Sequence, residues 1–239
     1  MNFMTTRHWP GFTFLWVVVL LSLENGVFEA IDKKNLKTII DYIRGYGIES
    51  RYQYAVAVRL DKKCCRNPNP TNLEAALPNN EMLQMQKAIK KENGIYIPST
   101  IKNIIAARPH KELPRKHAEW RLLNGGNNSP VEKLLANEGQ NSCFIFFSKI
   151  SPCVDRCLNM TDMKNIVRIL NPIFNRYSEN SRAFVFETIY YKDKEKQAEV
   201  VINAWKNIRH APLFKCNRNN CIRCFDNNLP ENSSPCYSR

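Results

Sequence analysis

Segments with the pattern of β-strands alternate along this chain with segments that have the pattern of α-helices. The strongest strand pattern is "CFIFFSK" at 143–149, which is almost entirely apolar. Residues 33–47 place apolar side chains at helical spacing and end in glycine, a usual helix stop. Alternation of this kind favours a layered α/β domain. Further strands are expected at 52–60, 94–99 and 182–191. Further helices are expected at 80–92, 117–123, 130–138, 152–177 (in two parts) and 193–208.

Two stretches between these elements carry turn signals. "CCRNPNPTN" at 64–72 is expected to be a loop that holds two cysteines, and the basic, proline-bounded segment 100–116 to be a connector. The last segment, 210–239, is rich in proline, asparagine and cysteine. We expect it to be a tail joined by disulfides to the main domain, which spans 31–209.

The N-terminus has the pattern of a secretory signal peptide. "FTFLWVVVLLSL" at 12–23 has the length of the apolar region of such a peptide, and Ala30 is a candidate for the last residue removed. Residues 1–30 are therefore expected to be a signal peptide; the alternative is an uncleaved anchor. No later stretch is apolar enough to span a membrane. We expect a secreted protein.

The charge of the chain favours a polyanionic partner. The full sequence carries +13, and removal of 1–30 takes away Arg7, Glu24 and Glu29, which leaves +14. Such a field attracts nucleic acid, heparin-like glycans or anionic lipid, and does not choose among them. The alternative is that the protein is merely soluble and basic. Hydrophobic residues make up 44% of the chain, enough to bury a full core, and nothing suggests wholesale disorder. Nothing in the sequence indicates an oligomeric state.

Four residues in two motifs could form a catalytic zinc site. His117 and Glu119 stand in "HAE", and Cys153 and Cys157 in "PCVDRC", which follows the strongest strand. One imidazole and two thiolates leave a fourth position of Zn2+ open, as in catalytic sites. Glu119 is not needed as a ligand and is placed to move the proton of a bound water.

The segment after Pro152 is expected to be a helix, because proline suits the first turn. A helix N-terminus favours thiolates, and positions four apart share one helix face. The alternatives are a surface histidine and a disulfide between Cys153 and Cys157, which such neighbours form poorly.

This constellation resembles the zinc-dependent deaminases, in which a His-x-Glu motif precedes a Pro-Cys pair and a second cysteine. "ISPC", at 150–153, is similar to the serine-proline-cysteine of the AID/APOBEC polynucleotide deaminases, and with the signal peptide the chain looks like the secreted AID/APOBEC-like deaminases of fishes and other vertebrates. The gap between Cys153 and Cys157 holds three residues where two is commonest. The resemblance covers about 33–209.

The resemblance implies a cytidine deaminase-like fold, a mixed sheet of about five strands with helices on both faces. It also implies conversion of cytosine to uracil: zinc-bound hydroxide attacks C4 of the base, and Glu119 shuttles the proton. Ser151 would lie at the pocket wall, and Tyr190 and Tyr191 would contact neighbouring nucleotides; packing at a strand end is the alternative for these tyrosines.

Three functions remain open at this point. The first is a secreted deaminase of single-stranded DNA or RNA, with the basic residues before His117 on the phosphates; these are Arg108, Lys111, Arg115 and Lys116. The second is a deaminase of free nucleosides, which needs no basic groove. The third is a non-catalytic basic protein that keeps zinc as a structural ion, which leaves Glu119 unexplained.

The chain has nine cysteines. With Cys153 and Cys157 assigned to zinc and Cys143 expected to be a buried free thiol, six remain, which suits three disulfides. Cys64 and Cys65 are expected to join the early loop to the tail, and the alternative is a second zinc site in the tail. The six candidates are Cys64, Cys65, Cys216, Cys221, Cys224 and Cys236.

Three sequons fit a secreted glycoprotein: Asn127, Asn159 and Asn232. We expect Asn127 to be the best of these, since it lies in a glycine-asparagine loop.

Overall fold

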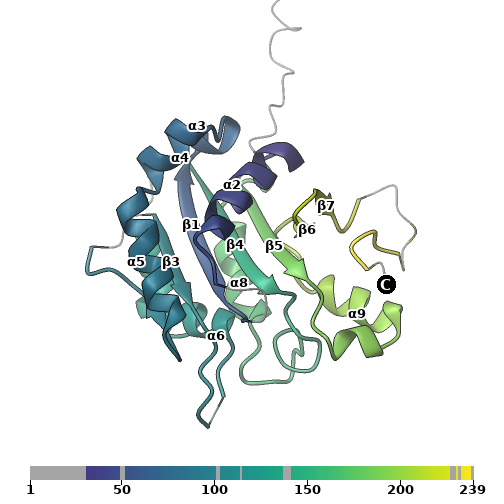
Figure 1. Ribbon diagram of the computed structural model, residues 1–239. Coiled ribbons are helices and arrows are strands. Elements are labelled where there is room, and N and C mark those ends of the chain that lie inside the picture. The colour runs from purple at the N-terminus through teal and green to yellow at the C-terminus, as the bar shows by residue number, and fades with distance from the viewer. Residues whose placement is uncertain are drawn as a thin grey trace, which may run out of the picture.

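The computed structural model describes residues 31–48, 52–100, 103–113, 115–136, 141–226, 230 and 233–237. Its centre is a mixed sheet of seven strands in the order β2-β3-β1-β4-β5-β6-β7 (Figure 1). Neighbours pair antiparallel except β4–β5 and β5–β6, which are parallel. The strands are β1 (Ala55–Asp61), β2 (Ile95–Tyr96), β3 (Ile104–Ala107), β4 (Ser142–Ile150), β5 (Arg182–Thr188), β6 (Leu213–Cys216) and β7 (Cys221–Arg223).

Helices cover both faces of this sheet. One face packs against α2 (Lys33–Gly45), α3 (Lys62–Arg66), α4 (Pro70–Ala76) and α5 (Asn79–Lys90). The other packs against α6 (Ala118–Leu123), α7 (Pro130–Leu135), α8 (Val167–Asn175) and α9 (Ala198–Trp205). The α/β fold class expected from the sequence is therefore confirmed.

The alternation of side chains along β4 divides the core in two. Phe144 and Phe146 contribute to the core beneath α6–α9, and Ile145 and Phe147 to the core beneath α2–α5. Successive side chains of a strand point to opposite faces, so a central strand that is apolar throughout must be buried on both. This is why "CFIFFSK" contains almost no polar residue.

The sheet has seven strands rather than the expected five. β3 lies inside the segment 100–116, which was expected to be a connector, because its four apolar residues pair with both β1 and β2. β6 and β7 come from the segment 210–239 and extend the sheet beyond β5. The prediction of a loop at 64–72 is also wrong, since α3 and α4 occupy most of this segment.

The disulfides in the structure differ from most of the cysteine pairing expected from the sequence. Cys65 is bonded to Cys143, so Cys143 is not a free thiol and Cys65 does not reach the tail. Cys64 is free and buried. Instead of a second zinc site, the tail cysteines form two local disulfides, Cys216–Cys221 and Cys224–Cys236.

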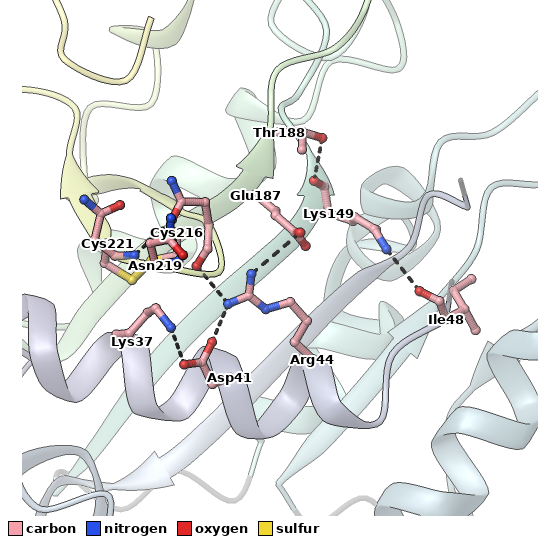
Figure 2. Close-up of polar contacts among 12 residues, drawn as sticks. Lys37, Asp41, Arg44, Ile48, Lys149, Glu187, Thr188, Cys216, Asn219 and Cys221 are labelled. Carbon is pink, nitrogen blue, oxygen red and sulfur yellow. Dashed lines mark hydrogen bonds and ion pairs between the residues drawn. A yellow bond between two sulfur atoms is a disulfide. The ribbon is translucent and has the colours of Figure 1, made fainter. Parts of the chain in front are cut away.

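A charged network at the C-terminal end of α2 ties three parts of the fold together (Figure 2). Arg44 contacts Asp41 on its own helix and lies 3.6 Å from Glu187 on β5. Its guanidinium also donates to the carbonyl of Asn217, between the two cysteines of the β6–β7 hairpin, at 3.0 Å. The side chains of Arg44 and Glu187 are mostly buried, so each needs the other's charge.

Arg44→Met is expected to destabilise the fold by about 2 kcal/mol, because it removes the guanidinium that lies 3.6 Å from the mostly buried Glu187 carboxylate. Lys37→Met removes a cation whose partner in the same network, Asp41, is exposed, and should cost about 0.5 kcal/mol or less. Urea unfolding measures both. Addition of Glu187→Gln to the Arg44 variant should restore part of the loss, and equal losses in the two single variants would contradict this account.

Within the described part of the chain, no helix has the length and apolar content needed to cross a membrane. The expected signal peptide at 1–30 lies outside the described residues.

Candidate active site

The site lies where β4 and β5 end. Because these strands are parallel, their carboxyl ends meet at one edge of the sheet, which is the usual place for a site in such folds. The backbone of Ser151 donates to the carbonyl of Thr188 at 2.7 Å and keeps the two chains together as they leave the sheet. "SPC" follows β4 directly, and Tyr190 and Tyr191 follow β5.

His117 is the N-cap residue of α6, and its side chain does not cap the helix. The imidazole turns instead toward the cysteines, with Nδ1 2.9 Å from Cys157 Sγ and 3.7 Å from Cys153 Sγ. The two sulfurs are 3.3 Å apart. All three donor atoms therefore lie close enough together to share one metal ion.

Cys153 and Cys157 lie on a single turn, not in the helix expected from Pro152 to Tyr177. The amide of Leu158 donates to the carbonyl of Cys153, five residues back, and the amide of Val154 donates to the Asp193 carboxylate. These bonds replace the regular helical ones, and the chain enters α8 only at Val167. The turn still places both sulfurs on the same side.

A hydrogen bond joins the two sulfurs, and the backbone amide of Cys157 also donates to Cys153 Sγ. The bond between the sulfurs lowers the pKa of Cys153. The same bond, together with burial, raises the pKa of Cys157. Hydrogen bonding to Cys153 also raises the pKa of His117. A cation between the donors would favour the deprotonated form of both thiols.

Glu119 is fully buried and held by two side chains. Ser148 Oγ, on β4, donates to Oε1 at 2.5 Å, and Gln53 Nε2, just before β1, donates to the same atom at 3.1 Å. Burial raises the pKa of this carboxyl above its ordinary value. A carboxylate that takes up a proton more readily than usual suits proton transfer near neutral pH.

A pocket of about 380 Å³ opens above these residues and is large enough for a base. Its lining includes the metal-site residues His117 and Cys153 and, of the expected substrate residues, Ser151, Tyr190, Lys111, Arg115 and Lys116. Tyr191 is exposed beside it and packs edge-on against Tyr190. Contact of these residues with a substrate stays a prediction.

Arg108 does not belong with the expected phosphate-binding residues. It is buried, donates to the carbonyls of Lys90 and Lys91 at the end of α5, and stacks on Tyr52. Its cation satisfies a helix C-terminus rather than facing the pocket.

A family model described as Secreted Novel AID/APOBEC-like Deaminase 1 matches residues 33–239. The chain belongs to this family. The resemblance inferred from the site motifs is thereby confirmed, and the match extends through the tail that contributes β6 and β7. No curated protein and no solved structure gave a significant match. The family is described as secreted, and three disulfides suit an oxidising compartment.

Three polar residues of this deaminase site carry no motif signal in the sequence. Gln53 and Ser148, which hold Glu119, stand in strand-like segments where neither spacing nor neighbours mark them. Asp193 lies beyond the tyrosines and reaches the cysteine turn through Val154. Each acts across a distance of at least 29 positions in the chain, so only the fold shows the contact.

The sequons of this family member differ in accessibility. Asn127 is exposed in the turn before α7, as a glycosylation site must be. Asn159 is half-buried two positions after Cys157, and its carboxamide accepts from the amide and hydroxyl of Thr161. Asn232 lies outside the described residues.

Asp193→Asn is expected to raise the melting temperature at pH 7.5 by a few degrees. Burial raises the pKa of Asp193 to about 6. The folded state therefore holds this proton more tightly than the unfolded chain, and stability is lost as the pH rises through 6. Asparagine keeps an acceptor for Val154 without the charge.

Thermal unfolding of both proteins from pH 4 to 8 measures the effect. The advantage of asparagine should be small near pH 4, grow up to about pH 6 and then stay constant. A difference independent of pH would show that the Asp193 charge is not what changes stability.

Proposed function

We propose that this chain is a secreted, zinc-dependent deaminase that converts cytosine to uracil in single-stranded nucleic acid. The observation that carries the proposal is the fully buried Glu119 carboxylate beside a His/Cys/Cys cluster, of which His117 and Cys153 line a pocket. A structural zinc site needs no such carboxylate, so Glu119 disfavours the alternative of a non-catalytic zinc protein.

The donor set fits zinc. Two thiols and one imidazole are typical zinc ligands, and a tetrahedral site separates such donors by about 3.5–3.8 Å. The separations here are 2.9, 3.3 and 3.7 Å, so small outward movements would accommodate the ion. When bound, zinc lowers the pKa of a water and so supplies a nucleophile at neutral pH.

Glu119 would carry two protons in turn, the first from the attacking water to the ring nitrogen of the base and the second from the added hydroxyl to the departing amine. Burial raises the pKa of this carboxyl, so it takes up a proton more readily than an exposed glutamate does. Ser148 and Gln53 both donate to Oε1, at 2.5 and 3.1 Å, and Gln53 lies 3.4 Å from Oε2. This arrangement supports Oε2 as the oxygen that transfers the proton.

The charge of the pocket favours a polynucleotide over a free nucleoside. Arg115 and Lys116 line the pocket beside His117, and both side chains are exposed. Phosphates on either side of the target base would lie near them, whereas a nucleoside has no phosphate to bind. We further propose that residues 1–30 direct secretion as a signal peptide and that Asn127 carries a glycan.

The test is uracil formation by the purified, zinc-loaded, disulfide-intact protein on cytosine-containing single-stranded DNA, with RNA and free cytidine in parallel. Uracil in an oligonucleotide but not from cytidine is the expected result. Turnover of cytidine alone would establish the nucleoside enzyme. Bound zinc without turnover of any of these substrates would contradict the catalytic proposal.

Gln53→Leu is expected to lower kcat by about ten- to a hundredfold with little change in KM, because Glu119 loses a side-chain donor that orients it. Leucine has a volume similar to that of glutamine. The matched control is Gln84→Leu, which makes the same change at an exposed position of α5. Steady-state kinetics and zinc content measure the effect. An unchanged kcat would show that Ser148 alone orients the carboxylate.

A further inference from the structure

The end of the C-terminal tail lies against the domain beside α9 (Figure 1). Cys236 is bonded to Cys224, which follows β7, and both residues are fully buried. The next residue, Tyr237, packs its ring edge-on against Trp205 of α9, with the ring centroids 6.0 Å apart. The disulfide and the ring contact therefore place the Tyr237 hydroxyl at a fixed point of the domain.

The Tyr237 hydroxyl binds the turn that follows the pocket tyrosines. This turn is the 3-10 helix η3 (Asp193–Glu195), and its first amide donates to the carbonyl of Tyr190 at 3.0 Å. The hydroxyl donates to the carbonyl of Lys196 at 3.1 Å and lies 3.4 Å from the carbonyl of Asp193. One side chain of the tail therefore holds both ends of this turn.

The side chains of the same two residues hold the turn that carries the two cysteines of the metal site. The buried Asp193 carboxylate accepts from the amide of Val154 at 3.1 Å, and the Lys196 ammonium pairs with Asp155 at 2.9 Å. Val154 and Asp155 stand between the two cysteines in the sequence. The Lys196 pair is partly exposed, so it contributes less than the buried Asp193 contact. Residues 193–196 therefore connect the tail to the metal site.

We infer that Tyr237 is a positioning residue of the metal site. Its hydroxyl fixes residues 193–196, and the Asp193 carboxylate then fixes the turn between Cys153 and Cys157 in the conformation that brings both sulfurs to one ion. Groups that lie behind the ligands of a metal site orient these ligands and raise the affinity for the ion. The inference rests on the proposed function for the identity of the ion, and goes beyond it by giving the tail a role in the site.

The alternative is that Tyr237 only anchors the tail. The tail has other anchors, which are the pairing of β6 with β5, the Cys224–Cys236 disulfide, and the Lys215 ammonium, which donates to the carbonyl of Cys236 at 2.9 Å. The ring of Tyr237 adds its contact with Trp205, which a phenylalanine would keep. The hydroxyl is the part of Tyr237 that binds the turn, so it can be removed while the tail stays attached.

The test compares Tyr237→Phe with Tyr42→Phe, which also removes a hydroxyl that donates to a backbone carbonyl, that of Leu77 at 2.8 Å on the other side of the sheet. Tyr237→Phe is expected to weaken zinc binding, measured by competition with a chelator, about five- to tenfold. In the metal-free protein, the amides of residues 153–158 should exchange their hydrogens faster in Tyr237→Phe than in the wild type. Tyr42→Phe should leave both measurements unchanged.

A second substitution tests whether Tyr237 acts through Asp193. Asp193→Ala should weaken zinc binding about tenfold or more, and addition of Tyr237→Phe to this variant should weaken it by less than about twofold further. Additive losses would overturn the inference. So would a wild-type zinc affinity in Tyr237→Phe, or an equal loss of zinc affinity in Tyr42→Phe, which would assign the effect to general stability.

Zinc affinity and hydrogen exchange are measured without turnover, so the inference and the proposed reaction can fail separately. Uracil formation by the wild-type protein is measured in parallel. If the wild type binds zinc and forms no uracil while Tyr237→Phe weakens zinc binding, the proposed reaction alone is rejected. If the wild type forms uracil and Tyr237→Phe binds zinc normally, the inference alone is rejected.

Discussion

Glu119→Gln is expected to lower deamination by about three to four orders of magnitude while zinc stays bound. The substitution keeps the size and polarity of the side chain but removes the group that accepts and returns a proton. His117, Cys153 and Cys157 are untouched, so the metal content should equal that of the wild-type protein. Uracil formation and zinc content measured on the same sample check both parts.

The stability of this variant adds a second readout. Burial raises the pKa of Glu119, so the carboxylate is held at some free-energy cost. Removal of the charge should leave the melting temperature unchanged or raise it, which excludes unfolding as the cause of lost activity. Cys157→Ser, in contrast, should lose zinc and activity together.

Glu179→Gln changes an exposed carboxylate in the turn before β5, is the matched control and should react normally. If Glu119→Gln kept the wild-type rate while Cys157→Ser lost it, proton transfer would have to be assigned to another group. Solvent water entering the pocket would then be the first candidate.

The catalytic constellation could be predicted from the sequence because its signals are local. His117 and Glu119 lie in one motif, Cys153 and Cys157 in another, and the strand before the second motif is unmistakably apolar. A parallel sheet then brings strand ends together without further information. The error about the helix after Pro152 did not affect the site, because a single turn also directs both sulfurs to one side.

The strands and site residues that could not be predicted from the sequence depend on contacts between residues far apart in the chain. β3 and β6 have four residues each, and β7 has three. Segments this short show too little alternation of apolar and polar residues to be recognised as strands from the sequence alone. Each becomes a strand through its neighbour in the sheet. The same holds for Gln53 and Ser148, whose role exists only because β1 and β4 lie beside α6.

Cysteine pairing is the clearest case of this limit. Six candidates allow fifteen connectivities, and sequence spacing does not choose among them. The structure bonds Cys65 on α3 to Cys143 on β4, across the core beneath α2–α5, and leaves its neighbour Cys64 free.

Cys65→Ala is expected to destabilise the protein by about 4 kcal/mol, the largest stability effect predicted for this chain. The bond closes a loop with a sequence separation of 78 residues, and a crosslink over that length strongly restricts the unfolded chain. Both cysteines are fully buried, so the loss of sulfur packing adds to the effect. Urea unfolding under non-reducing conditions is the measurement.

Cys64→Ala is the matched control, since it removes a neighbouring buried cysteine that forms no disulfide. It should cost about 1 kcal/mol, the price of one small buried group. Alkylation of the metal-free, unfolded, non-reduced protein should label Cys64, Cys153 and Cys157 and no other cysteine. If Cys64→Ala proved the more destabilising variant, Cys64 rather than Cys65 would be the residue bonded to Cys143.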